Sequence, residues 1–391
     1  MIDLANRLQK TQEYYFSIKL REVANMIAEG KKVINLGIGS PDLDPHPSVI
    51  QAINAAMHEP KAHQYQSYQG LLEMRQAMAQ FYKKYYQVTL DPTCEILPLM
   101  GSKEGIMHIA LAFLNPGDKV LVPNPGYPTY QSVLNIVGAE AVYYDLTAEN
   151  NWEPDWQVLN ELDLTNVKLM FTNYPHMPTG APGSKALYQK IVDFAKHKQI
   201  LVVNDNPYSF ILNDNPTSIL DAEGAKEVAI ELNSLSKSFN MSGWRVGMVV
   251  GAKYYMDAIL KIKSNMDSGM FYGIQKGAIK ALQLDNNWFN SLNEIYKKRK
   301  IKIVELANLL GCKVDENSVG MFVWAKLPEG SRSATEIIDY QLQHNHIFIT
   351  PGSIFGSNGN NYIRFSLCLS ENLINEAIMR VKQNQILNKI N

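Results

Sequence analysis

A lysine with three neighbouring serines and a following arginine forms the stretch of this sequence best suited to chemistry. Residues 234–247 read Ser-Leu-Ser-Lys-Ser-Phe-Asn-Met-Ser-Gly-Trp-Arg-Val-Gly, so Lys237 lies among Ser234, Ser236 and Ser238 and precedes Arg245. Hydroxyl groups and a guanidinium bind anions, and an amine beside them is a nucleophile. The pattern fits a phosphorylated aldehyde cofactor that forms a Schiff base with the lysine. For Ser-x-Ser-Lys alone, a surface lysine in a polar loop is the more frequent explanation.

Two other segments carry groups that suit the same cofactor. Residues 101–105 read Gly-Ser-Lys-Glu-Gly before an apolar helical run over 106–114, and small residues at a helix start expose N–H groups that bind phosphate. Asp205 and Tyr208 follow a buried apolar run, which is where ligands bind in open α/β sheets. An aspartate there can pair with a protonated pyridine nitrogen and strengthen the ring as an electron sink. In isolation, an N-cap or turn before Pro207 explains Asp205 more often.

A third segment offers an aromatic face. Tyr127 lies in Asn-Pro-Gly-Tyr-Pro-Thr-Tyr at 124–130, after another strand-like run, and could cover a planar ring. Its alternative role is that of a core tyrosine in a proline-rich turn.

Short β-branched apolar runs predict the elements that must position these groups. Turn signals flank each run, as is typical of buried strands. The predicted strands are 119–123, 141–146, 167–173, 200–204, 228–232 and 246–251. A helix is predicted over 184–198, where Leu187 and Ile191 recur on one face and Ser184 can cap the start. Alternating strands and helices predict an α/β fold with a mostly parallel sheet and helices on both faces.

The pattern changes near residue 285. A long lysine-rich helical segment over 288–310 precedes mixed strands and helices, which predicts a second, smaller α+β domain. The Lys-Lys-Arg-Lys run at 297–300 is expected to be a solvated face of that helix.

Composition argues against several classes of protein. The 391 residues carry 37 Lys and Arg against 38 Asp and Glu, and a net charge of −1 gives no basic footprint for nucleic acid or a membrane surface. No long apolar run predicts a membrane span, and the N-terminus lacks the apolar core of a secretory signal. Three scattered cysteines, Cys94, Cys312 and Cys368, predict no disulfide framework. We therefore expect a reducing, cytoplasmic location.

Two further motifs are set aside. Gly37-Ile-Gly39 begins like the dinucleotide-binding GxGxxG, but position 42 is Asp instead of the third glycine. His344 and His346 have no third ligand at a metal-binding spacing, so no metal is expected.

Taken together, these motifs resemble the class I/II aminotransferases, which are fold type I enzymes dependent on pyridoxal 5′-phosphate. The resemblance runs from Asn35 to Arg364 and beyond, with the motifs in the family's order. The segments at 101–105, 124–130, 234–247 and 265–271 resemble the branch of LL-diaminopimelate and alanine/aspartate aminotransferases.

The resemblance implies a fold and an assembly. It implies a seven-stranded, mostly parallel sheet in a large domain over 46–285, with residues 1–45 and 286–391 forming an N-terminal arm and small domain. It also implies a homodimer in which Tyr65 reaches the cofactor phosphate of the neighbouring subunit.

The resemblance also implies roles for site residues. Lys237 would be the catalytic Schiff-base lysine and proton carrier, Asp205 would pair with the ring nitrogen, and Tyr208 would bond the phenolic oxygen. Arg364 would bind the substrate α-carboxylate, and Gly39 would let the substrate approach the backbone. The remaining cofactor-binding residues would be Tyr65, Ser102, Lys103 through its backbone, Tyr127 stacked on the ring, Asn173, Ser234, Ser236 and Arg245.

Two positions depart from the family pattern. Met177 replaces the asparagine that normally bonds the phenolic oxygen, and a thioether cannot donate a hydrogen bond. Asn173, His176 or a water molecule could substitute. No arginine occurs in 264–273, so no clamp for a side-chain carboxylate is expected.

The implied reaction is ping-pong transfer of an α-amino group from an amino acid to a 2-oxo acid. Another fold type I enzyme, such as a carbon–sulfur β-lyase, a synthase or a racemase, is an alternative, because the same groups serve all of these reactions. A cofactor-binding protein without turnover is the other alternative, and only Met177 supports it.

Overall fold

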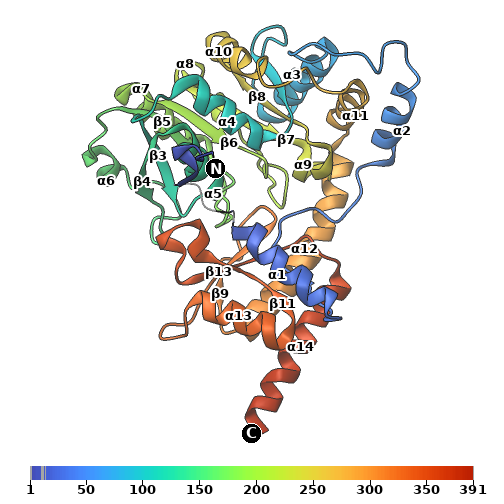
Figure 1. Ribbon diagram of the computed structural model, residues 1–391, viewed down its shortest axis with the longest axis vertical. Helices are drawn as coiled ribbons and strands as arrows, with labels where there is room; N and C mark the ends of the chain where they lie inside the picture. Colours follow the sequence, from blue (N-terminus) through green and yellow to red (C-terminus); the bar gives the residue numbers. More distant parts are fainter. Residues whose placement is uncertain (1, 10–12, 14, 391) are drawn as a thin grey trace.

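The computed structural model describes residues 2–9, 13 and 15–390 of the chain. A large domain is built on a seven-stranded sheet and a small domain on a four-stranded sheet, one above the other in Figure 1. Among the described residues, none of the helices has the length and apolar character that crossing a membrane requires.

The large sheet has the strand order β2-β8-β7-β6-β5-β3-β4. Its strands are β2 (Ile96–Leu99), β3 (Lys119–Asn124), β4 (Glu140–Asp145), β5 (Val167–Thr172), β6 (Leu201–Asp205), β7 (Ala229–Ser234) and β8 (Gly247–Gly251). β8 pairs antiparallel with both neighbours, whereas the other pairs are parallel. The expected α/β class is confirmed, and the six predicted strands coincide with β3 to β8.

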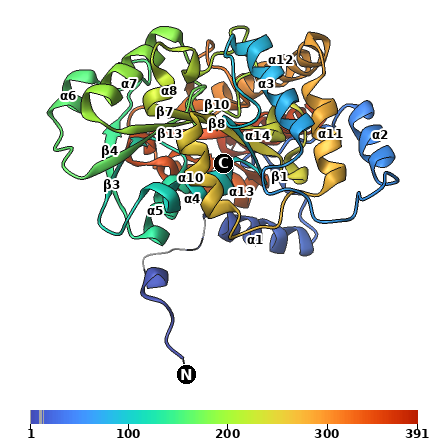
Figure 2. The same cartoon turned by 90° about the horizontal axis from the view of Figure 1, so that it is seen from above.

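Helices cover both faces of this sheet (Figure 2). On one face, α4 (Ser102–Phe113), α5 (Pro128–Val137) and α10 (Lys253–Lys263) bury apolar side chains such as Ile109 and Leu134. On the other face, α3 (Leu72–Tyr86) and α7 (Lys185–Lys198) bury Met78 and Ile191. Ser184 accepts a hydrogen bond from the Leu187 N–H, so the predicted cap begins α7. The other helices of this part are α2 (Pro47–Ala56), α6 (Trp156–Glu161), η2 (Ile219–Asp221), α8 (Ala225–Val228), α9 (Leu235–Ser238), η3 (Ser242–Trp244) and α11 (Tyr272–Leu282).

The small domain joins the two ends of the chain. Its antiparallel sheet has the order β12-β13-β10-β9, and β1 pairs in parallel with β11. These strands are β1 (Ile34–Asn35), β9 (Lys313–Val314), β10 (Phe322–Lys326), β11 (Ile347–Phe348), β12 (Thr350–Pro351) and β13 (Tyr362–Ser366). The helices are α1 (Tyr15–Ala28), α12 (Asn286–Leu309), α13 (Ala334–Asn345), η4 (Gly352–Phe355), η5 (Ser357–Gly359) and α14 (Glu371–Ile390). The short helix η1 (Asn6–Gln9) precedes them and contacts α5 of the large domain.

The lysine-rich helix α12 corrects one expectation. Lys297 and Lys298 are exposed as predicted, but Arg299 is only 3% exposed and pairs with Asp42. The expected solvated face is therefore wrong at Arg299, because one position of a helix can face the core while its neighbours face water.

Candidate active site

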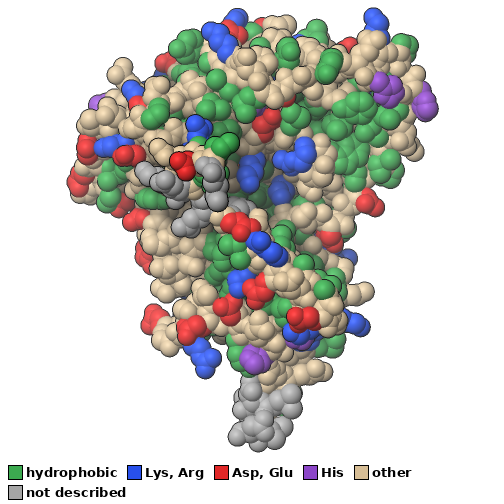
Figure 3. Space-filling view, viewed as in Figure 1, with side chains coloured by type: hydrophobic (Ala, Val, Ile, Leu, Met, Phe, Trp, Pro, Cys, Tyr) green, Lys and Arg blue, Asp and Glu red, His purple; other side chains and the backbone are tan. Residues whose placement is uncertain are grey.

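The predicted site residues come together at one edge of the large sheet. The carboxyl ends of the parallel strands meet there, and because β8 runs the other way, its amino end lies at the same edge. A cavity of about 390 Å³ opens at this edge, and Lys and Arg side chains gather in the hollow in Figure 3. The predicted residues that line it are Gly39, Ser102, Tyr127, Asn173, Asp205, Tyr208, Ser234, Ser236, Lys237, Arg245 and Arg364. Lys103 and Tyr65 lie outside this lining.

Lys237 points from α9 into the cavity. Strand β7 ends at Ser234, whose hydroxyl accepts from the Ser236 N–H and so turns the chain into α9. The Lys237 ammonium donates to the backbone carbonyl of Gly39. Burial, followed by Arg364 and Arg245, lowers the pKa of Lys237, while Cys368 and Asp205 oppose this shift. A lowered pKa raises the fraction of neutral amine, the form that attacks an aldehyde.

Asp205 ends β6 as a buried carboxyl group. Its Oδ2 accepts a long bond of 3.4 Å from the Tyr130 hydroxyl, and its Oδ1 has no hydrogen-bond partner among the described residues. Burial raises the pKa of Asp205 to about 7, against the lowering effects of Tyr130 and Lys237. A buried acceptor without a donor suits a cationic N–H. The positive charge of such a donor would favour the ionised form of the Asp205 carboxyl group.

The start of α4 provides a cradle for an anion. Gly101 has φ +91, and a Cβ there would lie 2.1 Å from Arg245 Nη2, so only glycine lets the guanidinium approach the helix. Across the cradle, the Ser234 hydroxyl lies 2.9 Å from that of Ser236, to which Arg245 Nη1 donates over 3.5 Å. Hydroxyls, a guanidinium and a helix N-terminus together suit a phosphate.

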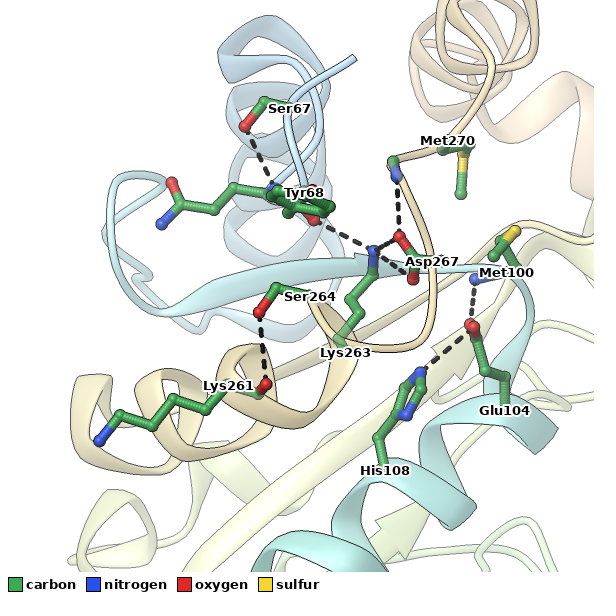
Figure 4. A network of polar contacts seen from close by, with 12 residues as sticks. Ser67, Tyr68, Met100, Glu104, His108, Lys261, Lys263, Ser264, Asp267 and Met270 are labelled. Carbon is green, nitrogen blue, oxygen red and sulfur yellow. Dashed lines mark hydrogen bonds and ion pairs between the residues drawn. The ribbon is translucent and has the colours of Figure 1, made fainter. Parts of the chain in front are cut away.

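Behind this cradle lies a network of charged side chains (Figure 4). Glu104 accepts from the Met100 N–H over 2.6 Å and lies 3.2 Å from Nε2 of the buried His108. Lys263 pairs with Asp267 at 2.8 Å. Donor atoms of Glu104, His108 and Asp267 lie within 4.8 Å of one another, a spacing open to a metal ion. The Lys263 ammonium already supplies a cation beside Asp267, so we do not propose a metal site here.

Arg364 is buried on β13 opposite Lys237. Its Nη2 donates to the Gly37 carbonyl over 2.8 Å and its Nη1 to the Met177 sulfur over 3.3 Å. Its Cζ lies 3.9 Å from the centre of the Phe322 ring and 4.7 Å from that of Phe355. A planar guanidinium held in this way suits two-point binding of a carboxylate.

Met177, which departs from the family pattern, makes a contact that the sequence did not predict. Its sulfur contacts Arg364, which is 187 positions away in the chain. Of the substitutes considered, Asn173 donates to the Asp205 backbone carbonyl and His176 bonds the Thr179 hydroxyl over 2.8 Å. Burial lowers the pKa of His176 to about 3, so this imidazole is neutral at ordinary pH. Burial raises the pKa of Tyr208, so its hydroxyl keeps its proton and can donate a hydrogen bond.

Part of the cavity lining is apolar, and sequence reasoning did not identify these residues as part of the site. Helix α1 contributes Phe16 and Leu20, and Ile38, Phe322 and Phe355 complete this apolar lining. Only the three-dimensional fold brings α1 over the site, because no motif marks these residues.

The residues present fit pyridoxal phosphate. The buried carboxyl oxygen without a partner, the amine and the glycine-dependent anion cradle match its ring nitrogen, aldehyde and phosphate. Tyr65 is 90% exposed and lies beside Met270 and Phe271 in a separate surface cavity, so it does not reach this site within one chain.

Comparisons with known proteins agree with this geometry. The family model described as aminotransferase class I and II matches residues 31–381. An LL-diaminopimelate aminotransferase of Nitratidesulfovibrio vulgaris is 39% identical over 97% of this chain and 98% of its own, and that of Halothermothrix orenii is 40% identical over 98% of each. Apo-BacF from Bacillus subtilis has a TM-score of 0.94 at 37% identity, with 98% of each chain covered. An aminotransferase from Staphylococcus aureus has a TM-score of 0.88 at 30% identity, over 97% of this chain and 98% of its own.

Proposed function

This chain belongs to the class I and II aminotransferases, enzymes that use pyridoxal phosphate to transfer amino groups, and on that premise we propose which residues carry the reaction and which amino acids it accepts. Membership of this family favours amino transfer over the β-lyase and over a protein without turnover. The bound cofactor supplies an electron sink for negative charge at the substrate Cα.

Lys237 is the proposed catalytic lysine. Its amine would hold the cofactor through the aldehyde group and, during the reaction, would carry the proton that leaves the substrate Cα. The lowered pKa of Lys237 supports this role, because the amine must be neutral both to attack and to accept a proton. Asp205 accepts from the ring N–H, and Tyr208 donates to the ring's phenolic oxygen.

The phosphate is assigned to the cradle at the start of α4. Ser102 and the Lys103 backbone, Ser234, Ser236 and Arg245 bind it, while Tyr127 covers the ring face and Asn173 fixes the Asp205 backbone. Arg364 binds the substrate α-carboxylate. Gly39 lets the substrate approach the backbone. A Cβ there would lie 2.3 Å from Phe322 Cζ, so a larger residue would also displace that ring.

The proposed amino donors carry an uncharged, largely apolar side chain. The observation that carries this proposal is the apolar lining formed by Phe16, Leu20, Ile38, Phe322 and Phe355. Burying a charged side chain against such residues is costly unless a partner charge is supplied. A second candidate is LL-diaminopimelate, because relatives with that activity in their names are 38–40% identical to this chain.

A donor panel separates these two candidates. The purified enzyme is given phenylalanine, leucine, methionine, glutamate and LL-diaminopimelate with 2-oxoglutarate or pyruvate, and kcat/KM is measured for each. We expect the apolar donors to exceed LL-diaminopimelate by about tenfold or more, since one mismatched group is worth a few kcal/mol. The reverse order would overturn the proposed substrate class. Borohydride treatment in the same preparation should attach the cofactor to Lys237, and attachment elsewhere would overturn the assignment of the lysine.

We further propose the assembly and setting of the enzyme. A homodimer would bring Tyr65 to the phosphate of the partner's site, and its exposure in one chain supports this. The domains are assigned as 46–285 and as 1–45 with 286–391, which the pairing of β1 with β11 supports. We propose that the enzyme is located in the cytoplasm. The free thiols of Cys94, Cys312 and Cys368 support this location, because the cytoplasm is reducing.

A further inference from the structure

An ion pair links two motifs that the reaction leaves unused. Asp42 stands where a dinucleotide-binding motif would have its third glycine, and Arg299 lies in the lysine-rich run of α12. The two guanidinium nitrogens donate to the two carboxylate oxygens over 2.7 and 2.8 Å. Arg299 Nη1 also donates to the Leu367 carbonyl over 3.0 Å, just beyond the strand that carries Arg364. Arg299 therefore ties Asp42 to the end of β13.

Asp42 belongs to a segment that crosses the active site. We name residues 35–44 the strap. Its Gly37 carbonyl accepts from Arg364 Nη2, and its Gly39 carbonyl accepts from the Lys237 ammonium. The strap thus bonds directly to the proposed carboxylate-binding arginine and to the proposed catalytic lysine.

The two ends of the strap are fixed by different contacts. At its start, the Leu36 N–H donates to the Phe348 carbonyl over 2.8 Å, and the Leu36 carbonyl accepts from the Ser366 N–H over 2.7 Å. At its end, Asn240 donates to the Asp44 carbonyl over 3.1 Å. Asp42, whose two carboxylate oxygens bind Arg299, lies between Gly39 and that end. Because such a pair has a defined geometry, it fixes orientation as well as distance.

We propose that Asp42 and Arg299 are positioning residues that hold the strap so that its two carbonyls stay against Arg364 and Lys237. The proposal rests on the roles assigned above to those two residues. Through Arg299, the strap and the end of β13 share one anchor. Loosening it affects the amine and the carboxylate site together.

The test compares Arg299→Met and Asp42→Asn with a matched control. Arg75→Met also removes a buried arginine, whose Nη1 donates to the Pro92 carbonyl away from the cavity. Asp42→Asn keeps the shape of the side chain and serves if Arg299→Met fails to fold. Thermal unfolding of all three variants measures how much each substitution lowers the stability of the fold.

The first measurement is the pH dependence of Lys237 labelling in the apoprotein, with pyridoxal and borohydride followed by peptide mapping. Loss of the Gly39 acceptor disfavours the ammonium, so the labelling midpoint should fall by about half to one pH unit in both test variants. A direct charge effect would instead move it in opposite directions, because one variant removes a cation and the other an anion. Asp205, Arg245, Arg364 and Cys368, the ionisable groups that act on Lys237, are unchanged throughout.

The second measurement is KM and kcat of the holoenzyme for its best donor. KM should rise about five- to tenfold in both test variants, because the carboxylate loses a well-oriented partner. The Arg75→Met control should change neither KM nor the labelling midpoint. Unchanged values in Arg299→Met and Asp42→Asn, or midpoints that move in opposite directions, would overturn the positioning role. If wild-type label is not on Lys237, the assigned function fails instead, so the two failures are distinguishable.

Discussion

Asp205 illustrates how one side chain can be costly for the fold and useful for the site. Its carboxyl group is buried without a cation among its hydrogen-bond partners, and burial raises its pKa to about 7 from an ordinary 3.8. The empty protein must therefore either protonate this group or bury its charge. A ring nitrogen that carries a proton removes this cost, which couples cofactor affinity to stability.

The pH dependence of the apoprotein should reveal this cost. Between about pH 4 and pH 7 the native state holds a proton that the unfolded state has lost, so the free energy of unfolding falls as pH rises. Asp205→Asn should remove this dependence and stabilise the apoprotein near pH 8 by on the order of 2–4 kcal/mol. Denaturant unfolding near pH 5 and pH 8 measures both effects. An identical pH dependence in wild type and variant would contradict the assigned pKa.

At this scale, the sequence predicted the groups that lie next to each other in motifs. Lys237, Ser234, Ser236 and Arg245 share one short segment, and a strand end marks Asp205. The contact of Met177 with Arg364 and the pairing of Arg299 with Asp42 could not be predicted, because each joins residues far apart in the chain. Local patterns carry no information about such partners, and a basic run on a helix ordinarily indicates solvent exposure.

Among the elements, the strap depends on having no side chain at Gly39. A Cβ there would lie 2.3 Å from Cζ and 2.6 Å from Cε1 of Phe322, a buried ring that packs on Arg364. Either the strap or the ring must move to admit a methyl group. Close packing thus explains Gly39, the second glycine of the pair that begins like a dinucleotide motif.

Gly39→Ala should weaken both substrate binding and the fold. We expect KM for amino donors to rise about tenfold, with a stability loss of about 1–3 kcal/mol from overpacking. Gly243→Ala is the control, because a Cβ at Gly243 meets nothing within 4 Å. Combining Gly39→Ala with Phe322→Leu should recover part of the stability. If Gly39→Ala and its control behave alike, the close approach has no functional consequence.

The strands show where the hydrophobic pattern of the sequence is sufficient to predict a strand and where it is not. β3 to β8 are short apolar runs with flanking turns, so pattern alone located them. β2 was missed because its sequence is only Ile-Leu-Pro-Leu and Pro98 argues against a strand. The structure places β2 at the edge of the sheet, where a residue without an N–H is tolerated.

At the scale of the whole molecule, Tyr65 is the predicted site residue that one chain leaves unused. It is exposed beside Met270 and Phe271, whereas the other predicted residues, Lys103 apart, line the cavity. A second copy of the chain would have to bring it to a phosphate. Because a two-fold dimer exchanges equivalent residues, each copy would complete the site of the other.

Mixed dimers can test this exchange. Lys237→Ala and Tyr65→Ala chains are expressed separately and together, and activity and cofactor affinity are measured. Each separate variant should have little activity, whereas a mixed dimer regains one complete site. Random pairing should then restore roughly a quarter of wild-type activity. Co-expression without recovery, or unchanged cofactor affinity in Tyr65→Ala, would rule out the role across the interface.

The pairing of β1 with β11 has a consequence for synthesis on the ribosome. The large sheet lies entirely between Ile96 and Gly251, so a nascent chain can assemble the anchoring half of the pocket first. The strap emerges earlier still, but Phe348 and Ser366, to which it bonds, are translated only after the whole of the large sheet. Until these two residues are translated, the apolar side chains beside the strap lack the surface against which they pack in the folded protein. Translation therefore adds the proposed carboxylate-binding arginine only after the large sheet. A chain cut short before Arg364 would keep the strands of the large sheet while lacking that proposed substrate contact.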